Sequence, residues 1–212
     1  MRVLPAEERY IPLGVELLKR GHPAVLPTDT LYGICADATN PEAVEKIYTL
    51  KWRNRRKPLI VLVEDPLWLE RFFGIPYSGL AEKLLLHPKP ISVILPVKGF
   101  EYLTRGGRGI AFRLVKGGFI KDFLRAFKRP VVAPSANWEG HPPAENPFHA
   151  YLYFGDAVPT YYNAGTLKGN PSALVSLLDA ERVEVLREGD LTGEEIEKLK
   201  SLAGNGDQST LQ

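Results

Sequence analysis

Apolar positions in the first fifty residues predict a helix, a short strand and a second helix. Leucines at helical spacing indicate a first helix that ends near Gly21, and the apolar run at 24–26 is typical of a buried strand. Asn40 is a favourable N-cap and Pro41 a favourable first helical residue. We expect the second helix to begin there and to end where a group of cationic residues begins.

The rest of the chain shows several apolar runs of strand length. The uninterrupted run 59–63 is typical of a strand covered on both faces. Thr192 and Glu195 have the spacing of a capping box at the start of a last helix. Further strands are expected over 91–97, 110–115, 131–133, 160–163, 173–177 and 183–186, and further helices over 65–73, 78–86, 119–127 and 147–154.

Strands and helices alternate irregularly, and the strands at 91–97 and 110–115 follow each other closely. Such a succession favours antiparallel pairing within an otherwise parallel arrangement. We therefore predict an α/β fold with α+β character: one domain, with an open, twisted, mixed parallel and antiparallel sheet and flanking helices. The 212 residues, 44% of them hydrophobic, are enough for one sizeable core. The domain is expected to cover 1–203, with 204–212 as a disordered tail.

Composition narrows the class of protein. A single cysteine, Cys35, excludes an internal disulfide, and its apolar neighbours favour a buried structural thiol over a nucleophile. The four histidines are scattered, so no structural zinc site is expected. There is no signal-peptide core and no apolar stretch approaching the ~20 residues of a membrane span. We expect a soluble, cytoplasmic protein.

Cations gather between the second helix and the strand at 59–63. Five of the seven residues at 51–57 are Lys or Arg, although the formal net charge of the chain is only +2. This is consistent with a solvated turn or with binding of an anion such as phosphate. Lys51 and Arg53, both expected to be exposed, share a face if the chain is extended there, but diverge by ~200° if the helix continues. Trp52 between them could stack on a base or pack in the core.

Three polar loops next to buried strands complete the candidate chemistry. Residues 28–32 offer two hydroxyls, a carboxylate and a phenol, although an ordinary turn has the same composition. Ser135 and Asn137 follow the strand at 131–133, and no Gly-x-Ser-x-Gly elbow marks Ser135 as a nucleophile, so hydrogen bonding to a ligand is the better interpretation. The loop 163–172 has glycines that permit close backbone approach. The standard phosphate-binding loops are absent from the sequence, so any nucleotide site must be built differently.

Seven segments, in order along nearly the whole chain, match one known family. They are Pro27-Thr28-Asp29-Thr30-Leu31-Tyr32-Gly33, Ala36-Asp37-Ala38, Lys51-x-Arg53 with Pro58-Leu59, Pro88-Lys89-Pro90-Ile91-Ser92, Arg113 in a middle strand, Pro134-Ser135-Ala136-Asn137 with Gly140, and Arg187-x-Gly189. Together these segments resemble the YrdC-like threonylcarbamoyl-AMP synthases, in their short, single-domain form.

The resemblance implies a nucleotidyltransferase that makes L-threonylcarbamoyl-adenylate and pyrophosphate from L-threonine, bicarbonate or CO2, and ATP, for N6-threonylcarbamoyladenosine in tRNA. It implies Mg²⁺ bound with ATP, a downstream threonylcarbamoyl transferase, and tRNA as a further partner. Lys51 and Arg53 would be the catalytic residues. ATP would be bound by Lys51, Arg53, Ser92, Asn137 and Arg187, and threonine by Thr30, Tyr32, Arg113, Ser135 and Ser172, with no metal ligand among them.

Three positions depart from the family's pattern. Ala173 stands where threonine is frequent, Glu139 where serine is frequent, and Leu62 where some members have histidine. These departures concern the threonine pocket more than the ATP site. The alternative function is RNA binding or RNA maturation on the same basic surface without adenylate chemistry, and a third is another carbamoyl or nucleotidyl transfer.

Overall fold

A computed structural model describes residues 2–77, 79–179 and 182–204. In these ranges ten strands form one mixed sheet in the order β1-β8-β2-β3-β7-β4-β6-β5-β9-β10. This confirms the predicted fold class. The strands are β1 (Val3–Pro5), β2 (Ala24–Pro27), β3 (Tyr32–Asp37), β4 (Ile60–Val63), β5 (Ile91–Pro96), β6 (Gly109–Leu114), β7 (Val131–Val132), β8 (Tyr161–Asn163), β9 (Ala173–Ser176) and β10 (Glu184–Arg187).

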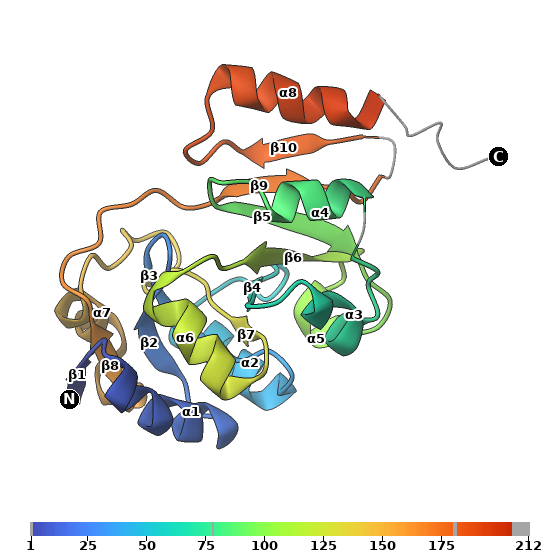
Figure 1. Cartoon of the computed structure of the whole chain (residues 1–212). Helices are drawn as coiled ribbons and strands as arrows, with labels where there is room; N and C mark the ends of the chain where they lie inside the picture. The colour runs from blue at the N-terminus through green and yellow to red at the C-terminus, as the bar shows by residue number, and fades with distance from the viewer. Residues whose placement is uncertain (1, 78, 180–181, 205–212) are drawn as a thin grey trace.

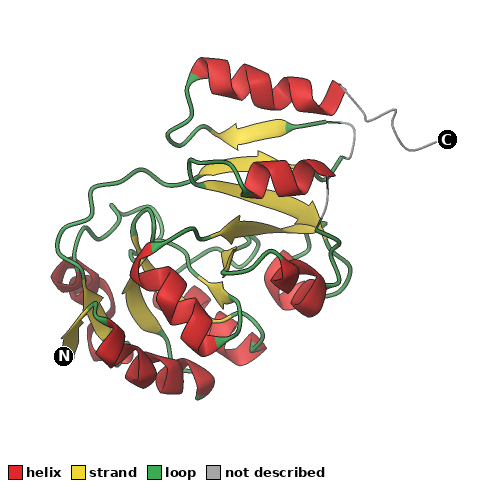
Figure 2. Ribbon diagram, viewed as in Figure 1, coloured by secondary structure: helices red, strands yellow, loops and turns green. Residues whose placement is uncertain are grey.

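Helices flank the sheet on the sides and at both ends (Figures 1 and 2). The helix α8 packs against β10 at one end, while α1 and α7 lie near β8 at the other. The helices are α1 (Ile11–Lys19), α2 (Pro41–Leu50), α3 (Leu67–Phe73), α4 (Gly79–Leu85), α5 (Glu101–Thr104), α6 (Gly118–Phe127), α7 (Pro147–Phe154) and α8 (Gly193–Gly204), with 3-10 turns at Glu8–Tyr10 and Gly155–Ala157.

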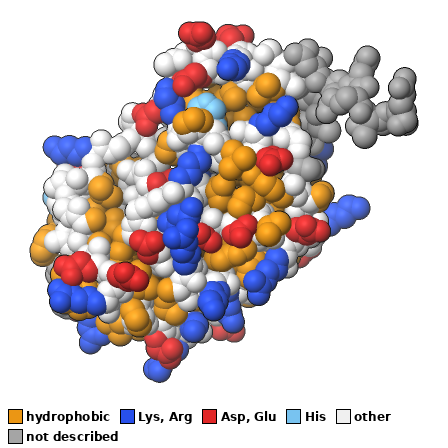
Figure 3. All heavy atoms as spheres, in the orientation of Figure 1, with side chains coloured by type: hydrophobic (Ala, Val, Ile, Leu, Met, Phe, Trp, Pro, Cys, Tyr) orange, Lys and Arg blue, Asp and Glu red, His pale blue; other side chains and the backbone are white. Residues whose placement is uncertain are grey.

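The helices form where the sequence pattern places them. In α6 the residues Ile120, Phe123, Leu124 and Phe127 are buried, which is the i, i+3, i+4, i+7 spacing of a single helix face. The capping box before α8 is confirmed by the bonds from the Thr192 amide to the Glu195 carboxylate and from the Glu195 amide to the Thr192 hydroxyl. Over the face shown in Figure 3, charged side chains of both signs surround a hydrophobic patch near α4.

Three antiparallel pairs, formed among β2, β3, β7 and β4, bring the ends of these four strands together on one side of the sheet. β2 and β3 form a hairpin in which Pro27 opposes Tyr32. β3 pairs with β7, and β7 pairs with β4, both antiparallel. The ends of β2 and β7 therefore lie beside the starts of β3 and β4, which gathers the loops 28–31 and 133–137 at one place.

Three elements were missed by the sequence analysis: β1, β3 and α5. The sequence analysis assigned no strand to the segment of β3, Tyr32–Asp37, but this segment is buried between two antiparallel partners. Gly33 and Ala36 have low strand propensity, which weakens the local strand signal. Hydrogen bonding to β2 and β7 stabilises the strand instead. Cys35 in β3 is buried, as predicted, and burial raises the pKa of its thiol to about 12.

Two expectations fall partly or wholly on residues outside those described. Ser78, expected to cap the helix that is now α4, is one of them. The expected tail begins at 204, yet α8 includes Gly204, and residues 205–212 lie outside the described ranges.

The cap of α2 gives a test of this local structure. The Asn40 side-chain oxygen accepts hydrogen bonds from the amides of Glu42 and Ala43, at 3.0 and 3.2 Å. Asn40→Ala should lower the free energy of unfolding by about 1 kcal/mol, because these amides lose their acceptor. Asn40→Asp keeps an acceptor oxygen and should leave the free energy of unfolding unchanged. Urea denaturation of both variants measures the difference. Equal loss in both variants would show that the cap does not stabilise α2.

Candidate active site

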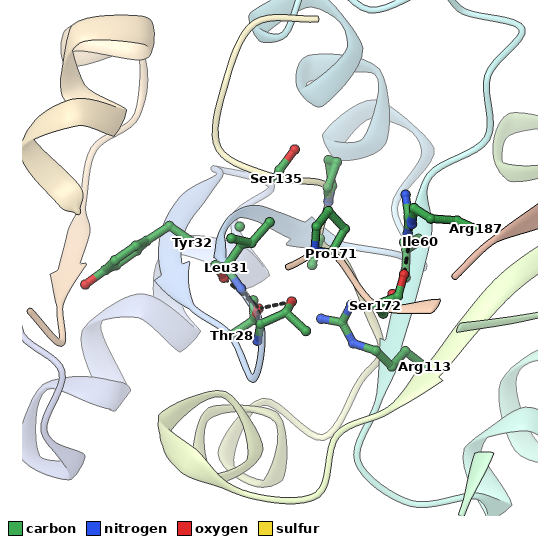
Figure 4. Close-up of a pocket in the computed structure, with 13 residues that line it drawn as sticks. Thr28, Leu31, Tyr32, Ile60, Arg113, Ser135, Pro171, Ser172 and Arg187 are labelled. Carbon is green, nitrogen blue, oxygen red and sulfur yellow. Dashed lines mark hydrogen bonds between the residues drawn. The ribbon is translucent and has the colours of Figure 1, made fainter. Parts of the chain in front are cut away.

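A pocket of about 100 Å³ lies at the edge where the strand ends meet. Its walls come from the β2–β3 turn, β4, β6, the segment after β7, the segment before β9, and the end of β10 (Figure 4). The lining residues are Thr28, Thr30, Leu31, Tyr32, Gly33, Ile60, Arg113, Ala133, Pro134, Ser135, Pro171, Ser172 and Arg187. Six of the ten predicted site residues are in this set: Thr30, Tyr32, Arg113, Ser135, Ser172 and Arg187.

Thr28 shapes the turn between β2 and β3. Its hydroxyl donates to the Leu31 carbonyl at 2.6 Å and accepts from the amides of Thr30 and Leu31, both at 3.2 Å. The Thr30 hydroxyl lies 3.2 Å from that of Thr28. The sequence analysis selected Thr30 but not Thr28. Threonine hydroxyls commonly bond the backbone of their own turn, and this property could have identified Thr28.

Tyr32 is one of the residues that line the pocket, but its side chain points away from the other labelled residues and its hydroxyl bonds the loop after β8 (Figure 4). The phenol donates to the Gly165 carbonyl at 2.7 Å and accepts from the Ala164 amide at 2.9 Å. In Figure 4 the hydroxyl points away from the other labelled side chains. Tyr32 thus fixes the segment that follows β8 against β3.

The segment between β8 and β9 crosses the sheet beside the pocket. It connects the second strand of the sheet order to the ninth and supplies Pro171 and Ser172 to the lining. A Cβ atom on Gly169 would lie 2.5 Å from the Thr30 carbonyl oxygen, so this residue must be glycine for the crossing segment to lie on the turn.

Arg113 on β6 is the cation at the base of the pocket. It is only 4% exposed, and its Nη2 bonds the carboxylate of Asp29 at 2.9 Å. Its Nε is buried with no hydrogen-bond partner among the described residues. Burial lowers the pKa of Arg113, and the Asp29 carboxylate opposes that shift. An unpaired guanidinium N–H in such a place favours an anionic or carbonyl oxygen from a ligand.

Asp29 was named in the sequence analysis as part of a loop but not as a site residue. The signal for it was electrostatic, because an arginine placed in a buried strand requires a counter-charge and Asp29 is the carboxylate of the adjoining motif.

A second arginine, Arg187, enters from the end of β10. Its Nε donates to the Ser172 carbonyl at 2.8 Å. Burial lowers the pKa of Arg187, and the charge of Arg113 lowers it further, so the two guanidinium groups act on one region. Together with a single carboxylate, Asp29, they give the pocket a net positive charge, which suits an anion.

Ser92 and Ser172 form one buried pair. Their hydroxyl oxygens are 2.8 Å apart, and both side chains are buried. Ser172 lines the pocket and Ser92 lies behind it. The sequence analysis assigned these residues to two different substrates, whereas the structure places them in direct contact.

Lys51 is buried, and the expectation that it is exposed was wrong. Its side chain is 2% exposed, and its Nζ donates to the carbonyls of Ser135 and Asn137 at 2.5 and 2.6 Å. The reason is the end of α2: Lys51 is the C-cap residue and points inward, toward the segment after β7. Burial lowers the pKa of Lys51 to about 7, and the nearby Arg53 lowers it in the same direction.

Ser135 and Asn137 are held by the same network. The Ser135 hydroxyl donates to the Asn137 amide oxygen at 2.5 Å, and the Asn137 Nδ2 donates to the carbonyls of Trp138 and His141 at 2.8 and 2.7 Å. The Ser135 hydroxyl donates to an amide oxygen, which is not a base. This geometry favours a hydrogen-bonding role for Ser135 over a nucleophilic one.

Arg53 does not share the environment of Lys51. Trp52 between them has a φ of +49°, and Arg53 is partly exposed, with its Nη2 bonded to the Pro58 carbonyl at 3.1 Å. The chain is therefore neither a continuing helix nor an extended strand at this point. Lys51 points into the protein, and Arg53 stays on the cationic loop 53–57.

Glu139, noted only as a departure from the family pattern, ties that loop to the segment after β7. Its carboxylate accepts from the Asn54 amide and from the Lys57 ammonium, both at 2.6 Å. These two bonds lower the pKa of Glu139, the Lys57 bond most. The Glu139 amide also donates to the Lys51 carbonyl at 2.9 Å.

The other two departures are buried next to residues that line the pocket. Leu62 is buried in β4 and is the register partner of Arg113 in the parallel β4–β6 pair. Ala173 is buried and opposes Ile91 at the start of β9, next to Ser172. The departures therefore concern the surroundings of the two pocket residues Arg113 and Ser172.

Carboxylate and histidine groups do not assemble a metal site here. Within the described ranges no group of three His, Cys, Asp or Glu side chains could hold a metal ion. Asp29, the carboxylate nearest the pocket, is paired with Arg113. These residues do not fit a protein-built Mg²⁺ site, so a magnesium ion would have to be held through the phosphates of a nucleotide.

The family model for Sua5, YciO and YrdC, described as "Telomere recombination", matches residues 16–189. The chain belongs to the Sua5/YciO/YrdC family. Among curated relatives, the threonylcarbamoyl-AMP synthase of Bacillus subtilis is 32% identical over 206 residues, covering 92% of this chain and 58% of the relative. That of Klebsiella pneumoniae is 26% identical, covering 88% of this chain and 98% of the relative.

Solved structures of the Sua5/YciO/YrdC family agree with the fold. Pyrococcus abyssi Sua5 complexed with L-threonine superposes with a TM-score of 0.80 at 26% identity, covering 93% of this chain and 59% of that one. Escherichia coli YciO gives 0.76 at 20% identity, covering 87% and 91%, which supports the fold alone. The chain spans about 58% of the length of the Bacillus and Pyrococcus synthases that it matches. No helix in the described ranges has the length and apolar character to cross a membrane.

The buried ammonium of Lys51 gives a prediction about pH. Because the pKa of Lys51 is about 7 in the folded protein and near its ordinary value of 10.5 in the unfolded chain, the unfolded chain binds one more proton between these values. The free energy of unfolding therefore gains a contribution from the deprotonation of Lys51 as the pH rises from 7. This contribution is complete above pH 10.5 and is lost as the pH falls to 7.

We expect the free energy of unfolding to rise from pH 7 to pH 10 more steeply in the natural protein than in Lys51→Met, which has similar length and no titration. Urea denaturation at four pH values measures both slopes. Identical slopes would mean that the carbonyls of Ser135 and Asn137 keep Lys51 charged throughout this range.

Proposed function

We propose that this chain is an L-threonylcarbamoyl-adenylate synthase, a nucleotidyltransferase that uses L-threonine, bicarbonate or CO2, and ATP. The observation that carries the proposal is the pocket itself. Two arginines, one with a free buried N–H, converge with serine and threonine hydroxyls in a space suited to a small polar anion. The named activity of the curated relatives and the threonine complex of a homologous structure support the same choice.

Threonine fits the pocket by its chemistry. The carboxylate, or the carbamate formed on its amine, would be bound by Arg113, which keeps Asp29 as its permanent counter-charge. Hydroxyls of Thr30, Ser135 and Ser172 would bind the polar groups of the amino acid. Tyr32 would act by fixing the position of the crossing segment, because its hydroxyl is already bonded twice.

The nucleotide would lie between the cationic loop and the segment after β7. Arg53 and Arg187 would bind phosphate oxygens, and Asn137 would face the same region from the network that also holds Ser135. Lys51 would act mainly by placing the carbonyls of Ser135 and Asn137, with its positive charge close behind them. Ser92 would act through Ser172. Magnesium would accompany ATP through its phosphates and neutralise part of their charge.

The reaction needs no enzyme nucleophile. The threonine amine adds to CO2 and loses a proton to give a carbamate. A carbamate oxygen then attacks the α-phosphorus of ATP and the bond to the β-phosphate oxygen breaks, which gives threonylcarbamoyl-AMP and pyrophosphate. Holding the carbamate and the phosphate chain in line, and stabilising the charge on the departing pyrophosphate, accounts for catalysis in such a site. The product would be used by a downstream threonylcarbamoyl transferase that modifies tRNA.

The proposal is tested by measuring pyrophosphate release from ATP with Mg²⁺ and bicarbonate, with L-threonine, with L-serine, and without an amino acid. We expect release that requires both bicarbonate and an amino acid and is fastest with threonine. Absence of release from a folded protein that binds ATP would refute the synthase and favour RNA binding.

Arg53→Ala tests the cationic loop in the same assay. Loss of one positively charged donor to the phosphates should lower kcat/KM for ATP by about 10²-fold or more. Arg20→Ala is the matched control, because Arg20 is an exposed residue at the C-terminal cap of α1 and pairs with Glu16. A full rate in Arg53→Ala would remove Arg53 from the mechanism.

A further inference from the structure

Glu139 contacts both ends of the connection between α2 and β4. Its backbone amide donates to the Lys51 carbonyl at 2.9 Å, and its carboxylate accepts from the Asn54 amide and the Lys57 ammonium, both at 2.6 Å. Lys57 and Asn54 precede Glu139 by 82 and 85 positions in the chain. One residue therefore joins the cationic loop 53–57 to the segment after β7.

The cationic loop needs a counter-charge because four of its five residues are Lys or Arg. Like charges this close repel one another unless a carboxylate lies among them. Among the residues that the structure describes, two carboxylates form ion pairs with the loop: Glu45 pairs with Arg55, and Glu139 pairs with Lys57. Glu45 lies in α2, next to the loop in sequence. Of these two, Glu139 is the one that ties the loop to a distant segment.

The anchored Lys57 also positions the guanidinium of Arg53. Arg53 donates from Nε to the Lys57 carbonyl at 3.4 Å and from Nη2 to the Pro58 carbonyl at 3.1 Å. The Arg53 side chain thus lies against the backbone of a residue whose side chain is held by Glu139. A displacement of Lys57 therefore displaces the guanidinium proposed to bind phosphate.

A ring contact holds the chain just before the cationic loop. The rings of Trp52 and Trp138 are stacked, with centroids 4.2 Å apart and planes inclined by 17°. Trp52 precedes the loop, and Trp138 precedes Glu139. The stack fixes the point where the chain leaves α2, and the Glu139 carboxylate fixes the loop that follows.

Serine is frequent in the family at the position of Glu139. A serine side chain is shorter and carries an uncharged hydroxyl. It does not provide the charged, two-oxygen acceptor that here binds Asn54 and Lys57 together. The departure therefore gives this chain a counter-charge for the loop that serine would not supply.

We propose that Glu139 is a positioning residue for ATP: its carboxylate holds the cationic loop so that Arg53 is already in place when the phosphates arrive. The identity of the anion rests on the proposed function. A loop that is ordered before binding loses less entropy when the ligand binds, so Glu139 raises the affinity for ATP. It acts through Lys57 and the backbone of the loop, and the chemical step is left to the residues of the pocket.

The test is isothermal titration calorimetry of ATP with Mg²⁺ and, separately, of L-threonine. Glu139→Ala should raise the Kd for ATP about tenfold, because the loop loses two hydrogen bonds to a charged acceptor. The Kd for L-threonine should not change, because the pocket residues do not bond to the Glu139 carboxylate. A general defect of the fold would weaken the binding of both ligands.

A double-mutant cycle tests whether Glu139 acts through Lys57. Glu139→Gln keeps an acceptor for the Asn54 amide but loses the charge that pairs with Lys57, so it should raise the Kd for ATP about threefold. In a Lys57→Met background the same substitution should have no further effect. Equal effects in both backgrounds would overturn the proposal.

Glu197→Gln is the matched control for loss of an exposed ion pair, because Glu197 pairs with Lys200 on α8 at 2.8 Å. It should leave the Kd for ATP unchanged. Circular dichroism establishes that each variant is folded, and Glu139→Gln with the Lys57→Met cycle tests the proposal if Glu139→Ala does not fold.

Amide hydrogen exchange followed by NMR, without any ligand, reports on the loop directly. In Glu139→Ala the Asn54 amide should exchange faster, because its acceptor is lost, while the amides of β3 should exchange as in the natural protein. An unchanged exchange rate at Asn54 would contradict the proposal.

An unchanged Kd for ATP in folded Glu139→Ala would also overturn it. A lower Kd would do the same, because it would show that the carboxylate competes with phosphate for the loop. These measurements need no turnover. A protein that binds ATP through this loop but fails the pyrophosphate assay would refute the synthase and leave the role of Glu139 intact.

Discussion

The site depends on one buried ammonium group. Lys51 ends α2, and its Nζ holds the carbonyls of Ser135 and Asn137, which lie 84 and 86 positions further along the chain. At 2% exposure the two carbonyl oxygens replace only part of the water that Nζ loses, and burial lowers the pKa of Lys51 to about 7. Those carbonyls, in turn, are fixed in the orientation that presents Ser135 to the pocket. The same lysine that the motif suggests for phosphate binding is thus a structural connector between two loops.

Around Lys51, hydrogen bonds and ion pairs hold the loops of the site in place. Glu139 closes the cationic loop onto the segment after β7, and Thr28 closes the β2–β3 turn on itself. Arg113 keeps Asp29 as a partner but retains one unused donor. Each loop is held by bonds to itself or its neighbour, so the groups that face the pocket do not have to order themselves when a ligand arrives. Preorganisation of this kind lowers the entropy lost on binding.

Much of this arrangement could be predicted from the sequence, and the exceptions have physical reasons. Long periodic elements such as α2 and α6 were located within a residue or two, because amphipathic spacing and caps are local signals. β3 was missed because its own residues give a weak strand signal and one of its two partner strands, β7, is distant in sequence. The burial of Lys51 was missed because charge predicts exposure, and only the tertiary structure shows the carbonyls that compensate for it. The contact of Ser92 with Ser172 likewise depends on the parallel pairing of β5 with β9.

The pocket residues extend from Thr28 on the β2–β3 turn to Arg187 at the end of β10, and the segment that crosses the pocket precedes β9. During synthesis on the ribosome, β2, β3 and even β7 emerge long before β9 and β10. The pocket therefore cannot close until almost the entire described chain has left the exit tunnel. The complete pocket would then form in the last stage of folding, so that a nascent or truncated chain lacks some of its lining residues.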